Sequence, residues 1–221
     1  MSHSMQLRLW LSGLSLALPL MAQAGSIQVT VVDREGKPVP DAVVVLAPPP
    51  GGPARAPLPT RLTISQEKMR FVPAVALVGV GAQGTFVNND PWEHHVRASA
   101  AGVQNFEAAS TGGFELRLDG KPEGKPGKVA EATFDKPGPV LLGCHLHGSM
   151  RGHVYVSDTP WAVLTNNDGV ASFDAVPEGA VKVRVWQADQ LIDVPVQQVA
   201  LGAAPMKTTV QLSIVPRRRR I

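Results

Sequence analysis

The 221-residue chain has one cysteine, few aromatic residues and no run of apolar residues long enough to cross a membrane. A framework of disulfides is excluded, because Cys144 has no second cysteine to pair with. Aromatic residues make up 5% of the chain, and no basic stripe is interleaved with them, which argues against a nucleic-acid partner. The sequence also lacks an apolar pattern with the helical period of 3.6.

The first 24 residues have the pattern of an export signal. Arg8 gives a positive start, residues 9–21 are mostly apolar, and residues 22–24 form the small-x-small pattern of a cleavage site. The apolar run is shorter than the ~20 residues that a membrane-spanning helix needs. We therefore expect residues 1–24 to be a signal peptide, and a mature protein exported to the periplasm without stable membrane insertion.

The formal net charge of +3 arises at the ends of the chain. Arg8 and the arginines of 217–220 account for five of the 21 basic residues, and without them the basic residues are fewer than the 18 acidic ones. The folded body is thus mildly acidic, and we expect residues 217–221 to be a solvated basic tail.

Nearly every periodic segment alternates with a period of two, which predicts an all-β sandwich protein. A Pro/Gly/Ala-rich stretch, 48–59, is expected to be a linker, and 119–128 is expected to be a polar loop. The predicted strands are 26–32, 42–46, 61–64, 76–80, 84–88, 95–99, 114–118, 130–134, 140–144, 152–156, 161–164, 170–173, 180–187, 193–199 and 208–214.

Two hairpin signals lie far apart in the chain. Residues 32–43 contain Asp33-Arg34-Glu35-Gly36, and residues 165–179 contain Asn167-Asp168-Gly169. In this order they resemble the hairpins of carboxypeptidase regulatory-like modules, which have an Ig/transthyretin-like fold. The resemblance implies one discontinuous small β-sandwich, 25–58 and 159–216, interrupted by a domain at 59–158. Two unrelated strand pairs flanking a sandwich remain the alternative.

The chemistry of the chain is concentrated in the intervening segment. Cys144, His147 and Met150 follow one another at intervals of three, so a loop after a strand can bring the three side chains to one point. Thiolate and thioether ligands favour copper, and imidazole suits both of its oxidation states. A second imidazole can come from His94, after the Asn-Asn-Asp-Pro turn at 88–91.

The segment from about 60 to 157 resembles the cupredoxins, the blue copper proteins that include plastocyanin and amicyanin. The Cys-x-x-His-x-x-Met spacing is most similar to amicyanin and to methylamine utilisation proteins. Met69-x-Phe71-x-Pro73 and Phe86-x-Asn88-x-Asp90 agree with that resemblance. It implies a Greek-key cupredoxin sandwich over 59–158.

Carried over to these positions, the resemblance implies one mononuclear type 1 copper. Its equatorial ligands would be His94, Cys144 and His147, and Met150 would be the weak axial ligand. The implied function is one-electron transfer without substrate chemistry, so the protein would not be an enzyme. Its partner would be a redox protein such as a cytochrome c or a dehydrogenase, and electrons would pass through the exposed edge of His147.

Four alternatives stay open at this stage. His95 could be the ligand in place of His94, although the match of His-x-Val to the family favours His94. Copper could be bound for storage, delivery or sensing, or zinc could replace it, or the motif could have lost its metal.

Family members often carry Asn after the first His, where it ties two ligand loops together, and here His95 stands there. We expect His95, His145 and His153 to be surface imidazoles, and the alternative is a second, weaker copper site or pH tuning of the first.

Overall fold

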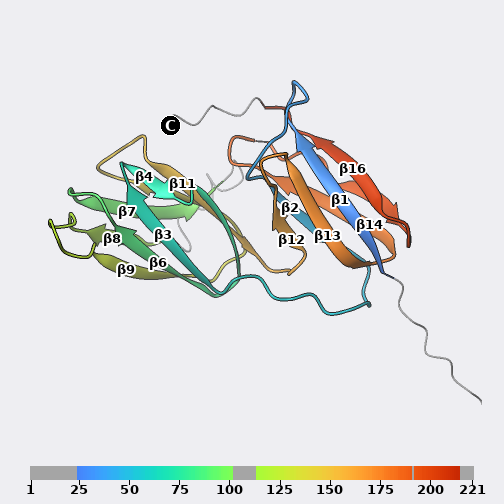
Figure 1. The fold of residues 1–221 in the computed structure, drawn as a ribbon, viewed down its shortest axis with the longest axis horizontal. Helices are drawn as coiled ribbons and strands as arrows, with labels where there is room; N and C mark the ends of the chain where they lie inside the picture. Colours follow the sequence, from blue (N-terminus) through green and yellow to red (C-terminus); the bar gives the residue numbers. More distant parts are fainter. Residues whose placement is uncertain (1–23, 102–112, 191, 215–221) are drawn as a thin grey trace, which may run out of the picture.

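The computed structural model describes residues 24–101, 113–190 and 192–214, and these form 16 strands and no helix (Figure 1). The all-β prediction is confirmed. The strands are β1 (Ala24–Val32), β2 (Val43–Ala47), β3 (Arg61–Glu67), β4 (Arg70–Val72), β5 (Val75–Gly79), β6 (Ala82–Asn88), β7 (His94–Ala100), β8 (Glu115–Leu118), β9 (Val129–Phe134), β10 (Gly138–Cys144), β11 (Arg151–Ser157), β12 (Ala162–Leu164), β13 (Val170–Pro177), β14 (Gly179–Trp186), β15 (Gln197–Leu201) and β16 (Met206–Gln211).

The described part of the chain contains no helix that could span a bilayer. Residues 1–23 of the predicted export signal and the basic tail at 217–221 lie outside the described residues. Both therefore stay predictions.

The two ends of the described chain build one pair of sheets, here called the outer sandwich. Sheet A has the order β13-β1-β16 and sheet B the order β12-β2-β14-β15. Alternate residues of β1, β2 and β14 fill the core between the two sheets, which explains the period of two in the sequence of these segments. The Thr165 hydroxyl donates to the carbonyl of Val39 and accepts from the amide of Ala42, which joins segments more than 120 residues apart. The likeness of this sandwich to transthyretin-like modules, and the domain boundaries, stay predictions.

Both predicted hairpin signals form turns. Asp33 Oδ1 accepts the amides of Glu35 and Lys37, and Asn166 Oδ1 accepts those of Asp168 and Val170. Gly36 and Gly169 have φ angles of 79° and 71°, in the left-handed region that favours glycine.

The segment between the two ends builds the other pair of sheets, the central sandwich. Sheet C has the order β4-β3-β6-β9 and sheet D the order β5-β11-β10-β7-β8. Their facing side chains form a second core, which includes Phe71, Phe86 and Leu142. Cys144 and Met150 belong to the same cluster, so the predicted ligand loop begins and ends in the core.

Most predicted strand ends differ from those of the structure by one to four residues. The segment 193–199 was expected to be a strand, but β15 is Gln197–Leu201. Pro195 has no amide hydrogen to donate to a neighbouring strand, which explains the later start. A short strand, β4, forms where none was predicted and pairs with β3.

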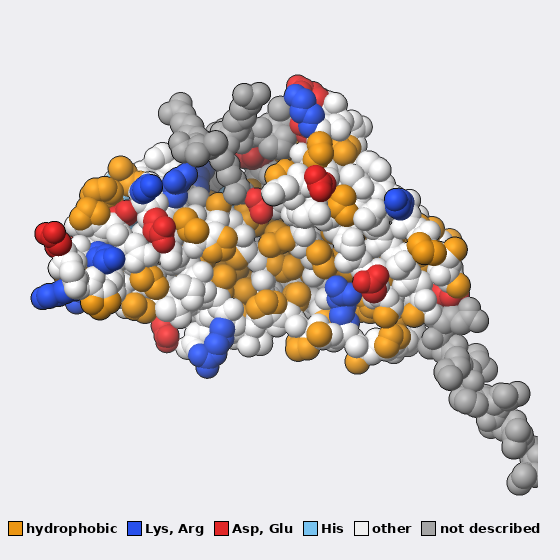
Figure 2. Space-filling model, in the orientation of Figure 1, with side chains coloured by type: hydrophobic (Ala, Val, Ile, Leu, Met, Phe, Trp, Pro, Cys, Tyr) orange, Lys and Arg blue, Asp and Glu red, His pale blue; other side chains and the backbone are white. Residues whose placement is uncertain are grey.

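A third apolar cluster joins the two sandwiches. It contains Val43 and Trp186 from sheet B, Val75 and Tyr155 from sheet D, and Ala162. Val43 points into this cluster while Val44 points into the core of the outer sandwich, so β2 is buried on both faces. Figure 2 shows hydrophobic side chains gathered across the middle of this face, between the two ends of the molecule.

The half-buried ring of His153 packs on Trp186 at this junction, with the ring centroids 5.7 Å apart. Burial lowers the pKa of His153, and Arg151 lowers it further, while Asp189 opposes both. The unfolded chain therefore binds a proton at His153 more readily than the folded chain does. Stability from this group is present above its unfolded pKa, and it is lost as the pH falls through the window below about 6.5.

We accordingly expect the wild type to lose more stability than the His153→Gln variant between pH 7.5 and pH 5. The measurement is the free energy of unfolding by urea at both pH values. His145→Gln, at an exposed histidine, is the control and should follow the wild type. Equal losses in the wild type and in His153→Gln would contradict the prediction.

Candidate metal centre

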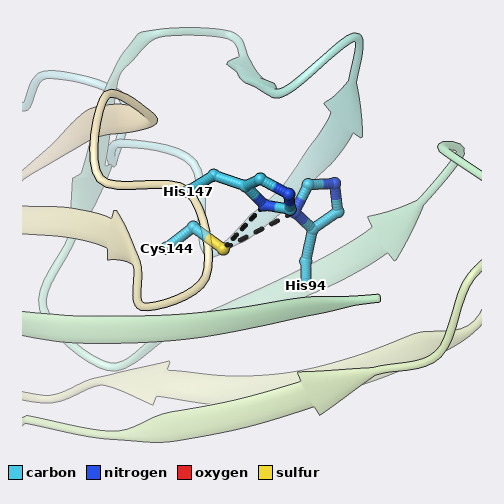
Figure 3. A group of neighbouring side chains, drawn as sticks. All are labelled: His94, Cys144 and His147. Atoms are coloured by element: carbon cyan, nitrogen blue, oxygen red, sulfur yellow. Dashed lines mark hydrogen bonds between the residues drawn. The ribbon is translucent and has the colours of Figure 1, made fainter. Parts of the chain in front are cut away.

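Three side chains of types that can bind a metal converge at one end of the central sandwich (Figure 3). Cys144 Sγ lies 3.6 Å from His94 Nδ1 and 3.4 Å from His147 Nδ1. The ligand atoms of all three lie within 4.8 Å of one another, and no other such group occurs among the residues that the structure describes. His94 and Cys144 are buried and His147 is half-buried.

The spacing of these atoms fits a bound metal ion. For a metal about 2.0–2.1 Å from nitrogen and about 2.3 Å from sulfur, angles of about 105–120° place the two atoms about 3.4–3.8 Å apart. Both sulfur-to-nitrogen distances lie in that range. The spacing alone suits zinc as well as copper. The sequence prediction adds a thioether from Met150 to this donor set, and such a soft sulfur ligand would favour copper.

The sheet register brings His94 and Cys144 together. β7 and β10 are neighbours in sheet D, and Cys144 at the end of β10 pairs with Val96. His94 and Val96 have the same phase on β7, so both side chains point into the sandwich core. The start of β7 and the end of β10 therefore lie side by side in sheet D, which brings His94 close to Cys144.

Asp90 fixes the ring of His94. Its Oδ2 lies 2.9 Å from His94 Nε2, which leaves Nδ1 facing Cys144. The same carboxylate accepts the backbone amides of Lys68 and Met69. Burial raises the pKa of the Asp90 carboxyl, but the hydrogen bonds from Met69, His94 and Lys68 outweigh it and hold the pKa below its usual value. Asp90 is thus an ionised acceptor for the His94 N–H at neutral pH.

Asn88 stabilises the loop that carries Asp90. Its side-chain amide donates to the carbonyls of Trp92, Leu118 and Asp119, and its Oδ1 accepts the Asp90 amide. The sequence motif named Asn88 and Asp90, but their role in holding His94 was not predicted. A signal was available, since a metal-ligating His commonly donates its other ring N–H to a carboxylate, and Asp90 is close to His94 in the sequence.

Backbone hydrogen bonds shape the loop from Cys144 to Met150. The Met150 amide donates to the His147 carbonyl, and the Cys144 amide donates to the Met150 carbonyl. Met150 is 1% exposed, so its side chain lies in the core cluster that also contains Cys144. The predicted fourth ligand is therefore on the buried side of the site, whereas His147 is on the solvent side.

The three remaining histidines of this sandwich lie outside the converging group. The His145 amide donates to the His95 carbonyl, so a backbone hydrogen bond ties the two ligand loops together. His95 Nε2 lies 3.3 Å from Glu115 Oε2, and its ring is 5.7 Å from that of His145. The expectation of a surface imidazole is wrong for His153, because its ring packs between the sandwiches.

No protein-family model matches the chain, and no curated protein matches it. Solved structures of two copper proteins are similar to part of it. A reduced amicyanin variant is 23% identical with a TM-score of 0.32, and the match covers 51% of this chain and 99% of that one. A copper-containing nitrite reductase from Thermus scotoductus SA-01 is 24% identical with a TM-score of 0.33, covering 51% of this chain and 26% of that one. These likenesses are too weak to carry an argument about function.

Proposed function

We propose that the protein is an exported electron carrier with one copper ion held by His94, Cys144 and His147, and by Met150 as a weak axial ligand. The observation that carries the proposal is the convergence of one thiol and two imidazole nitrogens at metal-binding distances. Bound copper would supply reversible one-electron chemistry at this site. The proposal includes a periplasmic location and a redox protein partner such as a cytochrome c or a dehydrogenase.

The surroundings of the site favour electron transfer over a substrate reaction. His94 is fixed by a buried carboxylate, and Cys144 is held in the ladder between β7 and β10. Ligands that are held in this way keep nearly the same positions in both oxidation states, which keeps the reorganisation on electron transfer small. The buried side of the site is apolar core, so water and a substrate molecule are kept from that side.

The half-buried His147 is the route by which electrons would leave or enter. Its neighbour Leu146 is 48% exposed, and Met69 and Trp92, on other loops of this sandwich, are 45% and 41% exposed. The proposal includes a single apolar docking patch formed by these side chains, since contiguous exposed apolar patches mark surfaces that bind other proteins. A redox partner docking here would come close to the His147 ring without a change in the copper ligands.

The test is an optical and EPR spectrum of the full chain loaded with copper. We expect an intense visible thiolate-to-copper band that is bleached by a reductant and restored by an oxidant. A colourless protein that binds Cu(I) tightly would overturn electron transfer and favour copper storage or delivery.

Asp90→Asn is expected to weaken copper binding by about 10–100-fold, because the carboxylate that orients a metal-bound His typically has an effect of that size. The band should remain, since every ligand is still present. Copper affinity measured by competition with a chelator checks this. Glu93→Gln, which removes a carboxylate that pairs with Arg117 instead, should leave the affinity unchanged. An equal affinity for Asp90→Asn and wild type would show that Asp90 does not orient His94.

A further inference from the structure

Gln66 has a fully buried side-chain amide that makes no hydrogen bond within the described residues. Its side chain is 0% exposed, and neither Oε1 nor Nε2 has a partner among the described residues. Burying an amide without a hydrogen bond destabilises the folded chain. A Leu of similar size would fill the same space without that cost. A polar group at this position therefore calls for a reason other than packing.

The register of sheet C places Gln66 at the metal end of the core. Ile64 and Gln66 have the inward phase of β3, and Gln66 pairs with Asn88 on β6. The Asn88 amide in turn bonds the carbonyl of Leu118, the residue that pairs with His94. Gln66 and His94 thus lie near the same end of the central sandwich, linked through Asn88 and Leu118.

The other neighbour of Gln66 places it against the sulfur side of the site. Gln66 pairs with Phe71 on β4, and the Phe71 side chain packs on Gly152 of β11, where an added Cβ would lie 3.0 Å from Phe71 Cβ. Gly152 follows Met150 by two residues and pairs with Leu142, two residues before Cys144. Gln66 thus has the inward phase of β3 and lies beside Phe71, which contacts the part of sheet D that carries Cys144 and Met150.

The Cys144 sulfur could accept a hydrogen bond from an additional N–H donor. The sulfur atom's hydrogen-bond partners in the described chain are the two imidazole Nδ1 atoms, which would bind the metal. A metal-bound thiolate would then have no N–H donor among these side chains, while Gln66 Nε2 is a buried donor with no acceptor. Hydrogen bonds to a charged acceptor are about twice as strong as neutral ones.

We propose that Gln66 is a positioning residue of the copper centre, whose amide N–H donates to the Cys144 thiolate and thereby raises the reduction potential. This rests on the copper site proposed above. The described conformation does not bond the amide to the sulfur, so the proposal includes a rotation of the Gln66 side chain when the thiolate forms. A donor at the sulfur withdraws electron density from the thiolate and favours Cu(I), and hydrogen bonding around the Cys sulfur is a known means of tuning such sites.

The experiment compares wild type, Gln66→Leu and Ile64→Leu as full-length proteins loaded with copper. The readouts are the reduction potential, the visible band and the thermal unfolding of the copper-free proteins. For Gln66→Leu we expect the ratio of Cu(I) to Cu(II) affinity to fall about tenfold, which is about 59 mV for a one-electron couple. The band should shift, and the copper-free variant should be at least as stable as the wild type. Ile64→Leu changes the same face of β3 without changing polarity and should leave the potential and the band unchanged.

A Gln66→Leu protein with the wild-type band and potential would overturn the role of Gln66. A higher potential in this variant would also overturn it, because the amide oxygen would then face the metal. If Gln66→Leu does not fold, Gln66→Met, which keeps the side-chain length, gives the same comparison. A wild type without the thiolate band would instead overturn the proposed function, so the two failures are distinguishable.

Discussion

Replacement of Cys144 by Ser is expected to abolish the visible thiolate-to-copper band completely. The sulfur lies 3.6 Å and 3.4 Å from the two imidazole nitrogens, so it is the one atom that contacts both. A hydroxyl is a hard ligand and does not ionise at neutral pH, so neither the charge transfer nor the soft-ligand preference for copper would survive. We expect copper affinity to fall by more than the roughly 10–100-fold loss that follows removal of an orienting partner alone.

The measurement is a copper titration followed by absorbance, EPR and competition with a chelator. Cys144 is buried, but Ser differs from it by one atom, so the copper-free variant should fold and lose about 1 kcal/mol of stability. Ser149→Ala changes an exposed residue of the same loop and should keep the full band. Retention of the band in Cys144→Ser would overturn its assignment to the thiolate, because the chain has no other cysteine.

The strands could be predicted from the sequence because one residue in two faces a core. The run from 42 to 46 shows the limit of that signal, since Val43 and Val44 are buried on opposite faces of β2. Alternation alone does not reveal that a second sandwich covers the outer face. The shifted start of β15 has a local cause in Pro195, which was visible in the sequence but was not used.

The site was predictable where the ligands are close in sequence and less so where they are distant. Cys144 and His147 are three residues apart on one loop, whereas His94 reaches them only through the pairing of β7 with β10. The support from Asp90 depends on three loops that meet in space, and no short motif contains all of its partners. Gln66 did leave a signal in the sequence, because it is a polar residue in the inward phase of β3, two positions after Ile64. The proposed role of Gln66 depends on Cys144 in sheet D, which lies across the core from β3 and is distant in the sequence.

Replacement of His94 by Gln, compared with replacement of His95 by Gln, is expected to decide which of the two adjacent histidines binds copper. His94 is 0% exposed and has its Nδ1 at the thiol, whereas the His95 ring is turned to Glu115 at 3.3 Å. The two residues point to opposite faces of β7, so one side chain cannot replace the other without reversing the strand.

We therefore expect His94→Gln to lose the visible band and more than 100-fold in copper affinity, beyond the effect of an orienting residue. His95→Gln should keep both, because the loop tie at this position is the His95 carbonyl and is unaffected by the side chain. Its stability should fall by about 1 kcal/mol, because the His95 side chain is 18% exposed and pairs with Glu115. The glutamine at position 94 can still donate to Asp90, so a loss of affinity there reports the missing nitrogen ligand and not an unpaired carboxylate. The reverse pattern, with the band lost in His95→Gln and kept in His94→Gln, would show that β7 shifts by one residue when copper binds.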